Sequence, residues 1–363
     1  MFKLFTLTTM ITCFVWVVEA ASADDSNFIN KRSIDQVLKN AKSKGFVGIV
    51  AVSSAEQMIY SQGIGDAEAG KTGYNSTTVV DIASVTKQFT GAAVVKLEQE
   101  QRLSFTDTLD KFFPEVGSDK GSVTLHQLLT HTAGFRRHLG RDEEAINKEN
   151  FIKRALSSNL VQPPGKGYRY SNVGYGLLAA VIETVTGQSY EDYLFSALWQ
   201  PAGMFSTGYF RPNWSGRDIP KLIEPHAGLY SALDILKKNG DENWHLFGNG
   251  GVLSTPEDMM KWHRVLMNTS LLSQKSKEKL FGIHVPETDP GYYYGYGWSI
   301  VPERAEGKLV WHNGISYFGK AEFWRFPESG LAIFIASHSG TVSPWSLANE
   351  LVAVIHGTLA ATE

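Results

Sequence analysis

A serine and a lysine three positions apart, Ser84 and Lys87, open a segment whose residue pattern is helical through Leu97. Side chains three positions apart lie on one face of a helix. A serine at a helix N-terminus lies in a positive backbone field that favours developing oxyanion charge, and a desolvated lysine amine can become neutral and accept the serine proton. The pair therefore predicts a serine nucleophile activated by lysine.

The same spacing recurs at Ser276 and Lys279, so the spacing alone is weak evidence. That second copy lies in a strongly charged segment, and we interpret it as a solvated helix face.

A second polar pair, Tyr170 and Asn172, follows a Pro-Pro-Gly loop and precedes a helical run at 175–185. A phenol near the lysine can relay a proton to the leaving group, and an amide can hold the lysine and the substrate carbonyl in place. Standing alone, the pair would be better explained as a loop tyrosine with a capping asparagine. The pair becomes evidence for a catalytic site because of its position after Ser84 in the sequence.

The order Ser-x-x-Lys, Tyr-x-Asn and a late (Lys/His)-x-Gly resembles that of class C β-lactamases and their penicillin-binding and esterase relatives. The third element here is His312 to Gly314, at the end of a strand-like run at 308–311. It is similar to the His-x-Gly variant of D-aminopeptidase-like and esterase-like members. The resemblance extends over nearly the whole mature chain, including the segments 128–135, 170–187, 201–204 and 250–258.

The resemblance implies roles for three residues of the late motif. Gly314 would let the substrate backbone approach, and the N–H of Ile315 would join that of Ser84 in an oxyanion hole. His312 would replace a permanently charged lysine by a group that is mostly neutral above pH ~6.5, which weakens the hold on a substrate carboxylate and makes it depend on pH. A literal Lys-Thr-Gly at 71–73 precedes the nucleophile, and we interpret it as unrelated to the site.

The elements that must position these residues are strands at both ends of the chain and helices between them. A helix is expected at 28–42, strands at 46–52, 57–63, 296–301, 308–311, 321–326 and 331–336, and a last helix at 345–355. We predict an α+β fold of the β-lactamase/transpeptidase type, with an antiparallel sheet built from both termini and flanked by helices. The sheet region would comprise 24–102 and 290–363, and a mostly helical insertion 103–289.

Composition and motifs exclude several classes of function. The formal net charge of −3, with no dense Lys/Arg stripe, argues against nucleic acid as a partner. Ligand clusters such as His-Glu-x-x-His are absent, so we predict no metal and no cofactor, and the absence of Gly-x-Ser-x-Gly argues against an α/β-hydrolase. The remaining histidines, including His126 and His131, are interpreted as loop-orienting or core residues.

The N-terminus has a basic start, an apolar stretch at 4–18 and small residues at 20–23, which predicts a signal peptide over 1–23 and an exported, periplasmic or secreted protein. Later runs are too short or too polar to predict a stable membrane span in the mature chain. The only cysteine, Cys13, would leave with the signal peptide. Lipidation at Cys13 is a weakly supported alternative.

Together these observations predict an exported serine hydrolase that forms an acyl-enzyme on Ser84 and cleaves amide or ester bonds. Small-molecule or peptide substrates, namely D-amino-acid peptides, β-lactams or small esters, all remain open at this point, as does the oligomeric state. The alternative is a penicillin-binding or sensor module that acylates without efficient turnover. An inert scaffold is a further alternative, because motif agreement alone does not establish activity.

Overall fold

The computed structural model describes residues 31–68, 72–224, 228–338 and 341–359. The predicted signal peptide at 1–23, with Cys13, and the first three residues of the helix expected at 28–42 lie outside the described residues.

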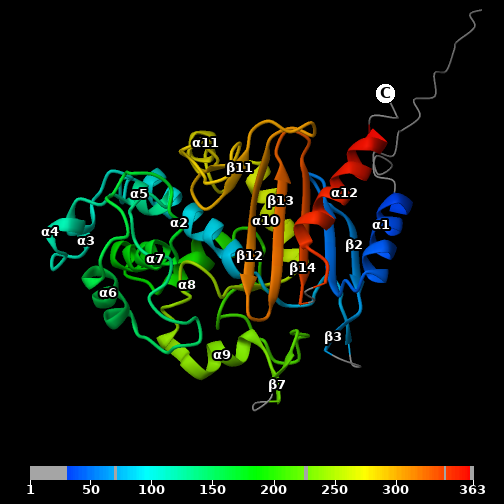
Figure 1. The fold of residues 1–363 in the computed structure, drawn as a ribbon, viewed down its shortest axis with the longest axis horizontal. Helices are drawn as coiled ribbons and strands as arrows, with labels where there is room; N and C mark the ends of the chain where they lie inside the picture. Colours follow the sequence, from blue (N-terminus) through cyan, green and yellow to red (C-terminus); the bar gives the residue numbers. More distant parts are fainter. Residues whose placement is uncertain (1–30, 69–71, 225–227, 339–340, 360–363) are drawn as a thin grey trace, which may run out of the picture.

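A single eight-stranded sheet forms the centre of the molecule, and all of its strand pairs are antiparallel (Figure 1). The strand order is β2-β1-β14-β13-β12-β11-β10-β9. The strands are β1 (Gly48–Ser53), β2 (Met58–Ile64), β9 (Val285–Pro286), β10 (Tyr293–Tyr294), β11 (Ser299–Val301), β12 (Leu309–Ser316), β13 (Gly319–Phe326) and β14 (Leu331–Ser337). Because β1 pairs with β14, the two ends of the chain build one sheet, which confirms the predicted fold class.

The sheet is covered on both faces, as strand β1 demonstrates. Successive side chains of a strand point to opposite faces. Ile49 and Ala51 enter the large core beneath the central helices, whereas Val50 and Val52 enter a second core beneath the terminal helices. All six residues of β1 are buried, so the strand reads as a continuous apolar run.

The terminal helices α1 (Lys31–Ser43) and α12 (Pro344–Leu359) pack against each other and cover the second core (Figure 1). Helix α1 contributes Ile34, Val37 and Leu38 to this core. The predicted order of terminal helix, hairpin and returning strands is therefore confirmed for the described residues.

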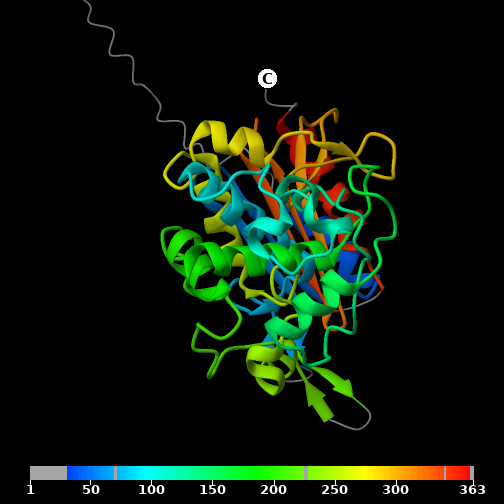
Figure 2. The same ribbon diagram turned by 90° about the vertical axis from the view of Figure 1, so that its left-hand side faces the viewer.

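The other face carries the helical middle of the chain (Figure 2). Its longest helices are α2 (Lys87–Gln99), α7 (Asn172–Thr186) and α10 (Pro256–Met267). Shorter ones are α3 (Leu109–Phe112), α4 (Ser118–Gly121), α5 (Leu125–Leu129), α6 (Lys148–Ser157), α8 (Tyr190–Leu194), α9 (Ala232–Asn239) and α11 (Gln274–Leu280), with single turns η2 (Ala83–Thr86), η3 (Phe195–Trp199) and η4 (Gly240–Glu242). Among the helices of the described residues, none combines the length and apolar character that a membrane span requires.

Three short two-stranded sheets lie outside the central one. They pair β3 (Asp66–Glu68) with β4 (Thr72–Gly73), β5 (Val80–Asp81) with β8 (Leu253–Ser254), and β6 (Leu222–Glu224) with β7 (Gly228–Tyr230). The β5–β8 pair matters for function because η2 begins two residues after β5 ends. It fixes the entry of the chain into the segment that carries Ser84.

Strands β11 and β12 differ most in extent from the prediction, and the short strands β9 and β10 were not predicted. Strand β11 is confined to Ser299–Val301, and β12 continues through Ser316 rather than ending at Trp311. The continuation forms because residues 312–316 pair with 319–323 of β13 in a tight hairpin. All three residues of the late motif therefore lie within a strand.

Candidate active site

Ser84 lies in the single turn η2, directly before helix α2 and opposite strand β12. The preceding residue, Ala83, has a φ of +45°, a left-handed conformation that is rare for a residue with a side chain. The Ala83 N–H donates to Asp81 Oδ1 at 2.8 Å, which holds this conformation. Ser84 itself is partly exposed between buried neighbours. Strained backbone over-determined by its surroundings is typical of functional positions.

Lys87 is fully buried, and its amine lies within hydrogen-bonding distance of Ser84. The Nζ atom lies 3.1 Å from Ser84 Oγ and 2.7 Å from the backbone carbonyl of Asn249. Burial lowers the pKa of Lys87 well below its ordinary value, the charge of Asp142 raises it, and that of Arg137 lowers it further. A neutral amine has two N–H donors and one lone pair, so it can donate to Asn249 and accept the Ser84 proton.

Tyr170 lies on the other side of the lysine, whose Nζ is 4.8 Å from the centre of the tyrosine ring. Burial raises the pKa of the Tyr170 hydroxyl above its ordinary value, and a hydrogen bond with Ser84 offsets part of this rise. The phenol is therefore protonated at neutral pH. The structure thus brings together the three residues that the sequence assigned to proton transfer and nucleophilic attack.

His131 supports the tyrosine from behind. Its ring centre is 4.4 Å from that of Tyr170, and its Nδ1 accepts the backbone N–H of Ser171 at 3.0 Å. The Arg169 N–H donates to the His131 carbonyl at 2.7 Å. These contacts on both sides of Tyr170 agree with the interpretation of His131 as a loop-orienting residue.

Asn172 does not contact Lys87 in the way that the sequence suggested. It is the first residue of α7, its amide Nδ2 lies 3.2 Å from His138 Nδ1, and its buried Oδ1 has no hydrogen-bond partner. The backbone carbonyl of Asn249 holds the lysine instead. Sequence reasoning missed Asn249 because a backbone carbonyl leaves no residue-type signal, although the neighbouring segment 250–258 resembled the family.

His312 is 3% exposed and faces the inside of the site. Its Nδ1 lies 2.6 Å from the carbonyl of Asn313, so this nitrogen donates, and its Nε2 lies 3.1 Å from the hydroxyl of Tyr294, from which it accepts. Burial, followed by the charge of Lys87, lowers the pKa of His312 to about 3. The expectation that this imidazole is cationic below pH ~6.5 is therefore wrong, because a buried neutral ring does not gain a charge in that range.

Gly314 is required by packing against the nucleophile segment, which differs from the role expected for it. A Cβ at this position would lie 2.3 Å from the Ile82 carbonyl oxygen, 2.9 Å from Ala83 Cβ and 3.0 Å from the Ser84 nitrogen. The backbone of η2, rather than a substrate, is what approaches Gly314. The glycine thereby brings β12 into contact with the segment that carries Ser84.

Ile315 follows on the open edge of β12 with 67% of its surface exposed. Strand β11 pairs with β12 only at Leu309–Trp311, so β11 does not cover the edge of residues 312–316. An extended substrate could pair with that edge, and its carbonyl would then lie near the N–H groups of Ile315 and Ser84. The oxyanion role of Ile315 stays a prediction.

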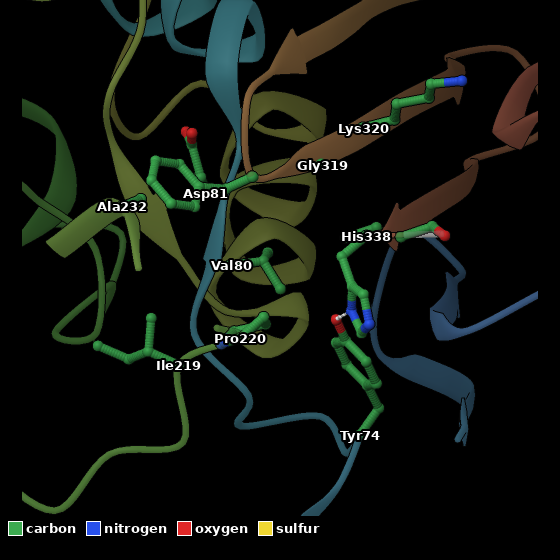
Figure 3. A pocket seen from close by; sticks show the side chains of 12 residues that line it. Tyr74, Val80, Asp81, Ile219, Pro220, Ala232, Gly319, Lys320 and His338 are labelled. Atoms are coloured by element: carbon green, nitrogen blue, oxygen red, sulfur yellow. Dashed lines mark hydrogen bonds between the residues drawn. The ribbon is translucent and has the colours of Figure 1, made fainter. Parts of the chain in front are cut away.

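Asp81 is a site residue that sequence reasoning missed. It accepts the Ala83 N–H and also a hydrogen bond from Ser316 at the end of β12, so one carboxyl group joins η2 to the late strand. Burial raises the pKa of Asp81. Asp81 also lines a pocket beside β5, where the side chains of Tyr74 and His338 are hydrogen-bonded to each other (Figure 3). A single aspartate three positions before a serine has no distinctive sequence signal.

The second Ser-x-x-Lys copy is built differently from the first. Ser276 is 3% exposed and donates to Gln99 at 2.8 Å, so its interpretation as part of a solvated face is wrong. Lys279 is paired with Glu98 at 2.5 Å and is therefore not available as a base. Among the described residues, no group of three or more His, Cys, Asp or Glu side chains is placed to hold a metal ion.

Comparisons with known proteins show the family of the chain. The family model described as Beta-lactamase matches residues 31–356. Penicillin-binding protein 4* of Bacillus subtilis is 27% identical over 290 residues, which cover 74% of this chain but 63% of that protein, so the chain spans less than two thirds of this relative.

Two solved structures share the fold. The octameric penicillin-binding protein homologue from Pyrococcus abyssi has a TM-score of 0.78 at 24% identity and covers 90% of this chain and 77% of its own. The D-amino acid amidase from Ochrobactrum anthropi SV3, complexed with D-phenylalanine, has a TM-score of 0.76 at 20% identity. The match covers 92% of this chain and 99% of the amidase.

Proposed function

The chain belongs to the Beta-lactamase family, and we propose that it is a serine hydrolase that forms an acyl-enzyme on Ser84. The observation that carries the proposal is the contact between the Ser84 hydroxyl and the fully buried amine of Lys87. A base must be neutral to take the serine proton, and burial lowers the pKa of Lys87 well below its ordinary value, which favours the neutral amine.

The reaction would proceed by acyl transfer. Ser84 Oγ attacks the substrate carbonyl carbon while its proton passes to Lys87 Nζ, and the carbonyl oxygen becomes an oxyanion near the N–H groups of Ser84 and Ile315. The carbon–nitrogen or carbon–oxygen bond then breaks as Tyr170 gives its proton to the leaving group and takes up the proton held by Lys87, which restores both groups. Water attacks the resulting ester by the reverse sequence, which releases the acid and restores Ser84.

The substrate would be a small molecule or peptide with an amide or ester bond, from the pool of D-amino-acid peptides, β-lactams and small esters. Two features of β12 favour uncharged substrates within that pool. His312 provides no fixed cation for a carboxylate, and the exposed side chains beside the open edge, Ile315 and Tyr317, are largely apolar. His312 therefore gives no reason to favour carboxylate-bearing lactams over small esters and amides.

Intact-protein mass spectrometry tests the proposal with three probes: a fluorophosphonate, a chromogenic cephalosporin and a p-nitrophenyl ester. We expect an adduct on Ser84 with the fluorophosphonate, its loss in Ser84→Ala, and its retention in Ser276→Ala, the matched control from the second Ser-x-x-Lys copy. An ester adduct that forms and decays indicates turnover. A persistent one would favour the penicillin-binding or sensor alternative, and an adduct that survives Ser84→Ala would overturn the site.

Export is a separate part of the proposal. We propose that residues 1–23 are removed as a signal peptide and that the protein is periplasmic or secreted, because the basic, apolar and small-residue regions follow in the expected order. Expression of the full chain in a bacterial host, followed by N-terminal sequencing of the extracellular or periplasmic fraction, would locate the cleavage point. An intact Met1 in the cytoplasm would contradict export.

A further inference from the structure

A buried cation lies far along the sheet from Ser84. Arg325, on strand β13, is 1% exposed, and its side chain extends between the sheet and helices α10 and α11. Its Nε donates to His263 Nδ1 at 3.0 Å, and its Nη2 lies 3.5 Å from the sulfur of Met267, a weak acceptor. Its Nη1 is buried and has no hydrogen-bond partner.

The described residues supply no negative charge to this guanidinium. No carboxylate forms an ion pair with Arg325, and its histidine neighbour is neutral because His263 Nδ1 accepts from Arg325 while Nε2 donates to the Gly330 carbonyl at 2.9 Å. Burial lowers the pKa of His263 to about 3. The rings of Phe281 and Trp298 lie near the guanidinium, with their centres 5.1 and 5.6 Å from its carbon.

Such an arrangement is costly for an isolated protein. A buried charge without a partner loses its hydration, and aromatic rings compensate only part of that loss. Burial correspondingly lowers the pKa of Arg325 to about 9, which still leaves the side chain cationic at neutral pH. An anion that reached Nη1 would restore a charge-assisted hydrogen bond.

A cleft lies beside this side chain. It has a volume of about 370 Å³, within the usual range for small-molecule sites, and Arg325 lines it together with Lys277 of α11 and Lys308 next to β12. Lys308 Nζ donates to the Phe281 carbonyl at 3.0 Å and keeps further N–H groups for a ligand. Burial lowers the pKa of both lysines.

Two carboxylates also line the cleft, and neither forms an ion pair with these three cations. Glu278 accepts from Gln274 at 3.3 Å, and the charge of Glu328 raises the pKa of Lys308 without direct contact. Three positive groups against two negative ones leave the cleft with one net positive charge. Arg325 is the most deeply buried of these five charged side chains.

We propose that this cleft is a binding site for a small molecule with an oxyanion group, either phosphate or carboxylate, held between Arg325 Nη1 and the amines of Lys308 and Lys277. The site is separate from the catalytic one. Both lie on the same face of the sheet, but Arg325 pairs with Val310 whereas Ala321 pairs with Gly314. Four residues of strand correspond to about 13 Å.

The test is thermal unfolding of the full chain in increasing inorganic phosphate or succinate, with ionic strength held constant by sodium chloride. A ligand that binds only the folded state raises Tm in a saturable manner, by about 4 °C at 100 times Kd for a chain of this length. A response to phosphate, to succinate or to both supports the site and identifies the oxyanion. The absence of a saturable rise with either would overturn it.

Variants locate the binding. Lys308→Met should weaken the apparent affinity by about tenfold or more, because it removes a charge-assisted hydrogen bond. Arg325→Met should abolish the response and should not lower Tm without ligand, because it removes an uncompensated buried charge. Lys39→Met, on the exposed face of α1, and Ser84→Ala should respond like the wild type. An unchanged response in Lys308→Met would overturn the proposal even if Arg325→Met fails to fold.

Discussion

Replacing Gly314 by alanine should disable Ser84 although it removes no reacting group. The added Cβ would lie 2.3 Å from the carbonyl oxygen of Ile82, and contacts shorter than 3.0 Å are essentially never observed for a real Cβ. The two atoms must therefore move apart by at least 0.7 Å. Because the opposing atoms belong to backbone and to the short side chain of Ala83, no flexible side chain can give way, and η2 must shift with its serine.

The magnitude follows from that displacement. A misplacement of about 1 Å in a reacting group can cost roughly 10²-fold in rate, so kcat/KM should fall by about that factor. Overpacking costs about 1–3 kcal/mol of folding free energy, which for a chain of this length lowers Tm by only about 1–4 °C. The variant should thus stay folded while it loses acylation.

The assay is steady-state hydrolysis of a p-nitrophenyl ester together with thermal unfolding of the same preparations. Gly357→Ala on α12 is the matched control, because a Cβ there meets no atom within 4 Å and alanine favours a helix. We expect the control to keep wild-type kcat/KM. A Gly314→Ala protein that acylates within about threefold of wild type would refute the argument that β12 fixes the position of Ser84.

Four further residues give predictions of their own. Lys87→Met and Tyr170→Phe should each lower kcat by about 10²-fold or more, and near-native rates in both would rule out their proton-transfer roles. Since burial depresses the pKa of Lys87, the loss of kcat/KM on acidification should occur well below the ordinary lysine pKa of ~10, and a loss of activity as pH falls through ~10 would contradict the lowered pKa. Asp81→Asn should lower kcat by about tenfold with little change in KM, because the Ala83 N–H loses a charged acceptor. If the rate of ester hydrolysis and the non-covalent binding of the ester fall by the same factor, the variant is generally unfolded and the argument for Asp81 fails. The ratio of kcat/KM for a carboxylate-bearing and a neutral ester should stay flat from about pH 5 to 8, because the pKa of His312 is about 3, and a ratio that changes near pH ~6.5 would restore it as the carboxylate selector.

What the sequence could predict depends on how local the contacts are. Ser84 and Lys87 lie within one turn of chain, so their types and spacing were enough to predict that they meet. The terminal strands could be predicted equally well, because an apolar run such as 48–53, bounded by polar residues, favours a strand whatever its position in the fold.

The errors concern partners that are distant along the chain. Asn249 is 162 residues from the lysine that it holds, and it acts through a backbone carbonyl that every residue type possesses. The burial of His312 depends on Tyr294 and on the pairing of residues beyond Trp311 with β13, which lengthened the strand past its expected end. Motif spacing therefore indicated which residues meet, but not which of their side chains are buried and which are exposed to solvent.

The burial of His312 has a consequence for the whole site. The bases around Ser84 are Lys87, His131 and His312, and burial is the largest cause of the lowered pKa of each. The charge of Lys87 further lowers the pKa of both histidines, so a proton on the lysine opposes a proton on either ring. A lysine at position 312 would place a second amine in the same desolvated space and compete for that proton. On the mechanism proposed above, the neutral imidazole leaves Lys87 as the group that gains charge during attack, which suits proton transfer to and from a single base.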